Sequence, residues 1–195
     1  MPSLFMLLTL LQAPPAALDN EYVRVTRDAA VCGEGGEGCR DRILVALDPI
    51  ELEGAGARKR MTRGEIAVFH AGARYRAPAG RFLEVVIKPG HPAATSPGVR
   101  IPPDKNAILY DGPEFFVFEE KLAPGDTRAR HSHTQRVVIV INKTRLQQWP
   151  DGQPEVFRDQ IPDDVRFNPP VIHVVKTVGE KPLRNIVIEF KPPAR

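Results

Sequence analysis

The distribution of proline limits the fold of this chain more than any other feature of its sequence. Proline occurs 20 times in 195 residues and is spread along the chain instead of being gathered into one tract. Because proline removes a backbone donor and breaks helix interiors, long helical bundles and coiled coils are disfavoured. The sequence predicts short strands joined by many turns, and a hydrophobic share of 42% is enough for a packed core.

Runs of alternating and β-branched residues predict strands along the chain, and no long stretch has a helical period. In the first part of the chain the predicted strands are 21–26, 42–47, 66–69 and 82–88. In the later part they are 115–122, 127–133, 137–142, 146–149, 165–167, 173–178 and 184–191. The class predicted from this pattern is all-β.

Similar blocks of sequence stand on either side of the Pro- and Gly-rich segment 89–106. The pairs of similar blocks are 42–47 with 136–141, 64–69 with 162–167, and 83–89 with 186–192. The blocks keep their order and have similar gaps, which indicates an internal duplication. Each copy would have ~80–90 residues, enough for a small antiparallel jelly roll. The alternative is that alternating strands are similar to one another by composition alone.

The N-terminus has the pattern of a secretion signal. The run from Leu4 to Leu11 is apolar except for Thr9, and small residues and prolines precede the first charge at Asp19. The run is shorter than the roughly 20 residues that span a bilayer, but it fits the ~7–15 apolar residues of a signal peptide. We predict a signal peptide over 1–17, a periplasmic or secreted location, and no membrane span after cleavage. No Lys or Arg precedes the run, so a packed apolar strand or a lipid-facing anchor remain alternatives.

Cys32 and Cys39 enclose a glycine-rich loop. Two cysteines this close in an exported chain predict a local disulfide, which would stabilise the fold by roughly 2–3 kcal/mol. Their spacing differs from the usual Cys-x2–4-Cys metal hook. The alternative is two reduced cysteines in a cytoplasmic protein.

Two of the five histidines, His131 and His133, are separated by one residue on a predicted strand. Both therefore project from one face, and Arg130, Ser132 and Thr134 are expected on the other, solvated face. The strand leads into an apolar run, so the histidine face is expected to be buried. Buried imidazoles are costly without partners, and metal coordination is the common remedy. The alternative is a pair of surface or hydrogen-bonded histidines.

The segment from Gly125 to His133 resembles the first motif of the cupin superfamily, in which Gly is followed after five residues by His-x-His. Of the second motif (Gly, five residues, Pro-x-Gly, two residues, His), the later copy retains only His173, with Pro162, Asn168 and Pro170 in the other places.

The earlier copy has Gly64, His70 and Gly72 in the second motif, but Tyr75 replaces its final histidine, and the His-x-His motif has no counterpart. The resemblance covers most of the chain and implies a bicupin-like protein of two tandem jelly-roll barrels. It implies a degenerate N-terminal barrel at 18–90, a linker at 91–106 and a C-terminal barrel at 107–195. In the degenerate copy we expect Tyr75 and His70 to be solvated.

The resemblance implies one metal site in the C-terminal barrel, held by His131, His133 and His173. The family's glutamate ligand should follow His133 by four or five residues, where Val137 and Val138 stand instead. The cofactor implied is one divalent transition metal, either Fe, Mn, Ni, Cu or Zn.

Three further residues near this motif are candidates for a site. Gln135 lies on the same face of the strand as the histidines and could supply an oxygen ligand. Arg136 and Arg128 could bind an anionic ligand, although Arg136 would oppose a cation if it pointed inward. No phosphate-binding loop is present, so no nucleotide cofactor is expected.

The predicted function is that of an exported cupin-domain protein that binds or acts on a small organic molecule. If the protein is an enzyme, the resemblance implies a metal-dependent oxygenase or isomerase. The alternatives are a metal-free ligand-binding or structural cupin with packed histidines, and an envelope protein that binds a partner. Nucleic acid is not expected as a partner, because the basic residues are dispersed and the run 58–60 with Arg63 reads as a solvated strand face. Cupins often pair through their sheets, which implies a homodimer.

Overall fold

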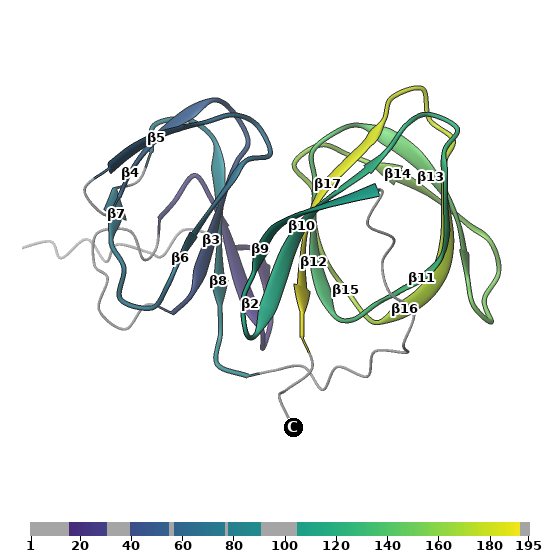
Figure 1. Ribbon diagram of the computed structural model, residues 1–195, viewed down its shortest axis with the longest axis horizontal. Helices are drawn as coiled ribbons and strands as arrows, with labels where there is room; N and C mark the ends of the chain where they lie inside the picture. Colours follow the sequence, from purple (N-terminus) through teal and green to yellow (C-terminus); the bar gives the residue numbers. More distant parts are fainter. Residues whose placement is uncertain (1–15, 31–39, 55–56, 77, 91–104, 192–195) are drawn as a thin grey trace, which may run out of the picture.

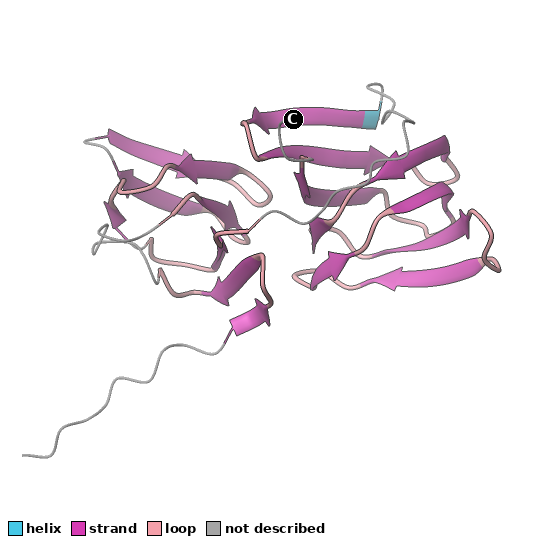
Figure 2. Ribbon diagram, turned by 90° about the horizontal axis from the view of Figure 1, so that it is seen from below, coloured by secondary structure: helices cyan, strands magenta, loops and turns pink. Residues whose placement is uncertain are grey.

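The computed structural model describes residues 16–30, 40–54, 57–76, 78–90 and 105–191. Within these ranges the chain consists of strands and their connections, with one short helical turn (Figure 2). The predicted all-β class is confirmed. The Cys32–Cys39 loop, residues 1–15 of the predicted signal peptide and residues 91–104 of the predicted linker lie outside the described residues. Export and the disulfide depend on these residues and stay predictions. The homodimer also stays a prediction.

Residues 16–90, here called the first half, form two sheets. The larger has the strand order β1-β2-β8-β3-β6 and the smaller the order β5-β4-β7. Their bounds are β1 Ala16–Asp19, β2 Val23–Arg27, β3 Arg42–Ala46, β4 Ile50–Gly54, β5 Ala57–Met61, β6 Ile66–Phe69, β7 Tyr75–Arg76 and β8 Phe82–Ile87.

Residues 105–191, the second half, also form two sheets, with the orders β15-β12-β17-β10-β9 and β11-β16-β13-β14. The strands are β9 Asn106–Asp111, β10 Phe115–Leu122, β11 Thr127–His133, β12 Arg136–Val140, β13 Thr144–Pro150, β14 Val156–Gln160, β15 Val165–Asn168, β16 Val171–Thr177 and β17 Leu183–Phe190. Asn106, placed in the linker by the sequence, is the first residue of β9.

The larger sheets of the two halves have the same strand order when each is read from its own first strand: β1-β2-β8-β3-β6 and β9-β10-β17-β12-β15. The strand registers also correspond, since Arg42 on β3 lies opposite Val86 on β8, and Arg136 on β12 lies opposite Glu189 on β17. This correspondence supports the internal duplication, which stays a prediction.

The structure shifts the alignment of one pair of similar sequence blocks, 64–69 with 162–167, by one residue. Gly64 and Asp163 both have positive φ, 84° and 68°, and each donates its backbone N–H over 2.8 Å, to Ala46 and Val140 respectively. Asp163 therefore occupies the turn position that corresponds to Gly64, and the assignment of Pro162 to that position was wrong. Aspartate is one of the few residues other than glycine that tolerate this backbone conformation.

Not every strand was predicted from the sequence, and the missed strands include short and highly charged ones. Among the described residues they are β1, β4, β5, β7, β9 and β14. In β4 the residues alternate, with Ile50 and Leu52 buried and Glu51 and Glu53 exposed. Two apolar residues among charges give too weak an alternation to predict a strand from sequence alone.

The largest group of buried apolar side chains lies between the larger sheets of the two halves, in the middle of the molecule (Figure 1). Strands β2, β3 and β8 meet strands β10, β12 and β17 there, and Tyr22 stacks on Phe167 with ring centroids 5.7 Å apart. The opposite faces of these sheets look toward the smaller sheets. Central strands β3 and β12 are consequently buried at every residue, which explains their continuous apolar runs.

Polar contacts at the edge of this apolar layer join the halves. Arg63 forms an ion pair with Asp163 at 2.6 Å and donates to the carbonyl of Ile141 at 2.9 Å, and Arg81 also pairs with Asp163. Arg184 of the second half lies against Gly64, where a Cβ would be only 2.7 Å from its Nη2. The prediction that Arg63 is part of a solvated face was wrong, because its partners come from the other half of the chain.

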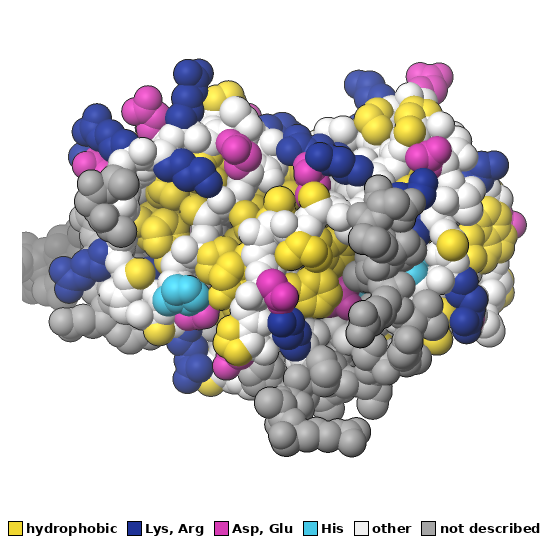
Figure 3. Space-filling view, viewed as in Figure 1, with side chains coloured by type: hydrophobic (Ala, Val, Ile, Leu, Met, Phe, Trp, Pro, Cys, Tyr) yellow, Lys and Arg dark blue, Asp and Glu magenta, His cyan; other side chains and the backbone are white. Residues whose placement is uncertain are grey.

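The surface shows no single concentration of basic residues on the side seen in Figure 3, where Lys and Arg are interspersed with Asp and Glu. Arg58, Lys59 and Arg60 are exposed, as expected. Within the described ranges, no helix is long and apolar enough to span a membrane.

Replacing Asp163→Asn should lower the free energy of unfolding at neutral pH by about 1–2 kcal/mol, because two arginines lose their carboxylate partner. Asparagine tolerates the positive φ at this position, so the change isolates the charge. Burial would raise the pKa of Asp163, but Arg81 and Arg63 outweigh burial and hold it below its ordinary value. The stabilisation is thus present above the unfolded pKa of 3.8 and is lost as the pH falls through the lower folded value.

Urea unfolding of both proteins between pH 3 and pH 7 measures this difference. The control is Asp159→Asn, since Asp159 is 72% exposed and lies 3.8 Å from Arg145. That variant should change stability by less than about 0.5 kcal/mol. Equal effects of the two substitutions would contradict a special role for Asp163.

Candidate metal centre

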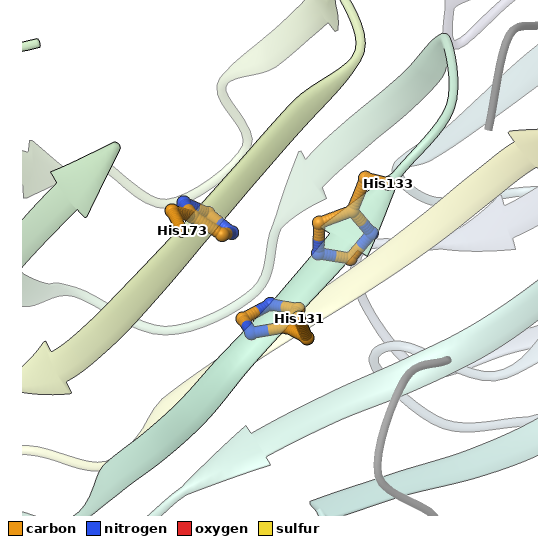
Figure 4. Close-up of side chains that lie close together, drawn as sticks. All are labelled: His131, His133 and His173. Atoms are coloured by element: carbon orange, nitrogen blue, oxygen red, sulfur yellow. The ribbon is translucent and has the colours of Figure 1, made fainter. Parts of the chain in front are cut away.

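Three histidines converge inside the second half. His131 and His133 lie two residues apart on β11, so their side chains share a face, and His131 is directly opposite His173 on the antiparallel strand β16. All three side chains are at most 6% exposed, and one ligand atom from each lies within 4.8 Å of the others. Figure 4 shows the three rings turned toward a common space. The structure therefore brings together the three histidines that the cupin resemblance singled out.

The hydrogen bonds of the rings leave nitrogen lone pairs free. His131 Nδ1 lies 2.8 Å from the carbonyl oxygen of Ala129, which can only accept, so Nδ1 carries the hydrogen and Nε2 carries the lone pair. Nε2 of His131 and Nε2 of His173 are both buried without a hydrogen-bond partner. A metal ion is the group that would satisfy two such atoms at once, so the residues fit the cofactor that the fold implies.

A carboxylate orients the third ring. Nδ1 of His133 lies 2.7 Å from Oε2 of Glu189 on β17, which directs Nε2 of the same ring away from the carboxylate. The other oxygen, Oε1, accepts from the backbone N–H of Thr134 at 2.8 Å. Carboxylate–histidine pairs of this kind fix the tautomer of metal-binding histidines and raise their basicity.

Burial keeps the imidazoles neutral. Burial lowers the pKa of His131. Burial also lowers the pKa of His133 well below its usual value, and the charge of Arg136 adds to this effect. Burial and the two neighbouring histidines lower the pKa of His173 to about 2. Neutral imidazole is the form that coordinates metals, so no proton has to be displaced from these rings at pH 7.

The place of the missing glutamate ligand is occupied by an apolar side chain. Val138 is directed into the barrel and lines the cavity beside the histidines, whereas Val137 packs in the core between the halves. No carboxylate joins the three histidines among the described residues.

Two buried acidic residues near the site were not found by sequence reasoning. Glu189 contacts His133, and Glu120 on β10 lines the cavity while accepting from Arg128 at 2.5 Å and Asn185 at 2.9 Å. Burial would raise the pKa of Glu120, but the charge of Arg128, together with the hydrogen bond from Asn185, outweighs burial and holds the pKa below its ordinary value. The available signal was a glutamate next to a run of apolar strand residues, as at Glu189 after Ile186–Ile188 in β17.

The remaining predicted residues have different surroundings. Arg136 lines the cavity and is 7% exposed. Arg128 is completely buried, does not line the cavity, and binds Glu120 and the Asn106 side chain, so its position is that of a structural residue. Gln135 is half-buried between β11 and β12, its Oε1 has no hydrogen-bond partner, and it too does not line the cavity.

The expectation that Ser132 and Thr134 are solvated was wrong, since they are 4% and 5% exposed. Thr134 is buried because its hydroxyl donates to the Phe190 carbonyl at 2.6 Å and because Glu189 accepts its N–H. Arg130, the third residue on that face, is exposed as expected.

The cavity next to the histidines has a volume of about 220 Å³. His133 and His173 lie on its wall, and the side chains around them come from both sheets of the second half. Pockets for drug-sized ligands are usually ~300–1,000 Å³, so this cavity fits a smaller molecule.

The corresponding position in the first half is closed. Tyr75 lies opposite Gly54 on β4, as His173 lies opposite Pro150 on β13. Tyr75 is 3% exposed, its hydroxyl donates to Glu84, and Phe69 stacks on its ring at 4.4 Å. The expectation that Tyr75 is solvated was therefore wrong, while His70 is exposed. Among the described residues of the first half, no strand corresponds to β11.

No protein-family model matches the sequence, and no curated protein matches it. Solved structures do match. A cupin 2 conserved barrel domain protein from Leptotrichia buccalis is similar with a TM-score of 0.51 and 12% identity, over 89% of this chain and 86% of that one. AerE from Microcystis aeruginosa is similar with a TM-score of 0.58 and 10% identity, over 88% of each chain.

A putative glyoxylate induced protein from Pseudomonas aeruginosa matches with a TM-score of 0.62 and 12% identity, over 89% of this chain and 74% of that one. At such low identity these likenesses concern the fold alone. Together with the strand order they show that this chain has the cupin fold, and the predicted class of cupin-type jelly-roll barrels is confirmed.

Replacing Glu189→Gln should weaken metal binding about 10–100-fold. A glutamine can direct its NH₂ group at Nδ1 of His133, which would move the ring hydrogen to Nε2 and remove the lone pair that faces the site. Competition with a chromogenic chelator measures the affinity, and circular dichroism checks that the variant folds. The exposed Glu155→Gln is the control and should bind metal like the unchanged protein; a Glu189→Gln protein with unaltered affinity would disprove the orienting role.

Proposed function

We propose that this protein binds one divalent transition metal through Nε2 of His131, His133 and His173, and a small organic molecule in the adjoining cavity. The observation that carries the proposal is the pair of buried Nε2 atoms on His131 and His173 that lack any hydrogen-bond partner. Leaving a buried polar atom unsatisfied costs about 1–3 kcal/mol, so two of them beside each other need an explanation. A shared metal ion supplies it.

The chain's own residues prepare the site for a cation. The backbone of Ala129 holds the ring of His131 in the tautomer that coordinates through Nε2. Burial raises the pKa of Glu189 to about 7, and in its ionised form Glu189 holds the ring of His133 in the same tautomer. Three neutral histidines contribute no negative charge, and Glu120 on the cavity wall is already paired with Arg128, so the charge of a cation would be left for a bound anion to offset. A bound metal would supply Lewis-acid or oxygen-activating chemistry to a small substrate, with coordination positions left open for it.

The competing function is a metal-free cupin that binds a small ligand. Arg136 favours this alternative, because its buried guanidinium lies close enough to His133 to lower the pKa of that histidine and would repel a cation. The two functions predict different metal contents, which makes them separable.

Protein purified without a histidine tag from metal-supplemented medium should contain about one transition metal per chain, measured by plasma mass spectrometry. The double variant His131→Ala, His133→Ala should lose the metal, because a single histidine cannot hold it at micromolar concentration. His70→Ala is the matched control, since His70 is exposed and pairs with Asp41. Metal-free protein after reconstitution with Fe, Mn, Ni, Cu and Zn would overturn the proposal.

The substitution Val138→Glu should increase metal affinity, because it places a carboxylate on the cavity wall where the cupin motif has one. The same change should lower the stability of the metal-free protein by about 1–3 kcal/mol, since a carboxylate is introduced where the buried isopropyl group of valine stood. Val138→Gln has a similar size without the charge and should gain little affinity. Isothermal titration with Zn²⁺ and Mn²⁺ measures both variants, and equal affinities would show that position 138 does not face the metal.

A further inference from the structure

We propose that the cavity beside the histidines binds a small organic carboxylate, held by the guanidinium groups of Arg136 and Arg158. The inference deepens the proposed function by naming the class of molecule for the same cavity. It does not require that a metal is bound, and it can therefore be tested separately.

Arg158 is the first observation. It lies on β14 opposite Leu146 of β13, and its side chain lines the cavity. It has no hydrogen bond or ion pair with another described residue. Burial and the neighbouring Arg166 lower its pKa more than Asp164 raises it, so an anion bound beside Arg158 would stabilise its charge. Arg158 is exposed and lies on the cavity wall, where an arginine without a hydrogen-bond partner is a candidate binding group for an anion.

Arg136 is the second observation. Its Nη1 donates to the carbonyls of Thr134 at 3.2 Å and Pro169 at 2.8 Å, which fixes the guanidinium at the cavity wall. No described residue accepts from its Nε or Nη2, and neither of these atoms is fully buried. The group is thus pre-oriented, with donors left for a ligand.

The other charged groups of the cavity are already paired. Arg166 donates from Nε to Asp164 at 2.6 Å, and Glu120 accepts from Arg128. The cavity therefore has an excess of positive charge from Arg158, and a metal ion on the histidines would increase it. An anion between the metal and the two arginines would relieve the repulsion between Arg136 and the cation.

The rest of the wall indicates an organic anion. Valine and leucine side chains make up much of it: Val138, Leu146, Val156, Val171, Val175 and Val187. A carboxylate matches the planar fork of a guanidinium, and a short aliphatic body would contact the valines. Inorganic phosphate could bind the arginines but would leave this apolar wall uncovered. With a volume of about 220 Å³, the cavity is larger than the ~150 Å³ that hold a benzene ring, so it admits a body of roughly six to eight carbon atoms.

The test is calorimetric titration of the full chain, first treated with chelator and then loaded with metal. The probes are acetate, propionate, malonate and succinate, with propionamide and succinamide as neutral analogues and inorganic phosphate as the competing anion. We expect at least one carboxylate to bind the metal-free protein and its amide not to bind. Metal should tighten carboxylate binding, and by linkage the carboxylate should tighten metal binding by the same factor.

The variant Arg158→Gln should weaken carboxylate binding about 10–100-fold, the effect of losing one charge-assisted hydrogen-bonded pair. Arg158 lies at the exposed mouth and binds no other described residue, so the variant should fold. Arg145→Gln on the adjacent strand is the control, because Arg145 lies over the ring of Phe157 and does not line the cavity. The control should bind carboxylates like the unchanged protein.

The inference is overturned if no carboxylate binds in either metal state, if phosphate binds as tightly as the best carboxylate, or if Arg158→Gln and Arg145→Gln behave alike. Metal content, measured independently, separates the two proposals. Metal bound through the histidines without carboxylate binding would remove this inference alone. Carboxylate binding in a chain that never takes up metal would remove the metal function alone.

Discussion

The apolar contact between the two larger sheets is the interaction on which the rest of the structure depends. It covers the outer face of each of these sheets, so that β3 and β12 are buried on both sides. A sheet held on both faces is a rigid support, and β12 and β17 place Arg136, Val138 and Glu189 in the second half at fixed positions. The histidines lie on the smaller sheet, and Glu189 on the supported sheet orients His133 across the barrel, so the geometry of the site depends on that support.

The buried polar side chains at corresponding positions of the two halves, Tyr75 and His173, differ in whether they have a protein partner. In the first half, Tyr75 donates to Glu84 and the guanidinium of Arg42 lies 5.7 Å from the tyrosine ring, so the interior is closed by its own side chains. In the second half, His173 occupies the place of Tyr75 and its Nε2 has no protein partner. Buried polar atoms without protein partners and a cavity beside them occur together in the second half, which is why we assign ligand binding to it.

Much of the central fold could be predicted from local sequence, and the site only in part. Strands with apolar runs such as β6 and β10 were predicted to the residue, whereas charged strands such as β5 were missed because their apolar alternation is weak. The histidines were found through a short motif. Glu189 and Arg158 were not, since neither belongs to a motif, and His133 meets Glu189 across 56 residues of chain.

The sequence by itself determined that His131 and His133 share a face, that the chain forms strands, and that a tyrosine replaces a histidine in the first half. These properties follow from the two-residue period of a strand and from spacing within a motif, which are local. Only the tertiary structure decided that His173 lies opposite His131, that Glu189 orients His133, and that Arg136 and Arg158 face one cavity. These contacts depend on the register and packing of strands far apart in the chain, and no local pattern encodes them.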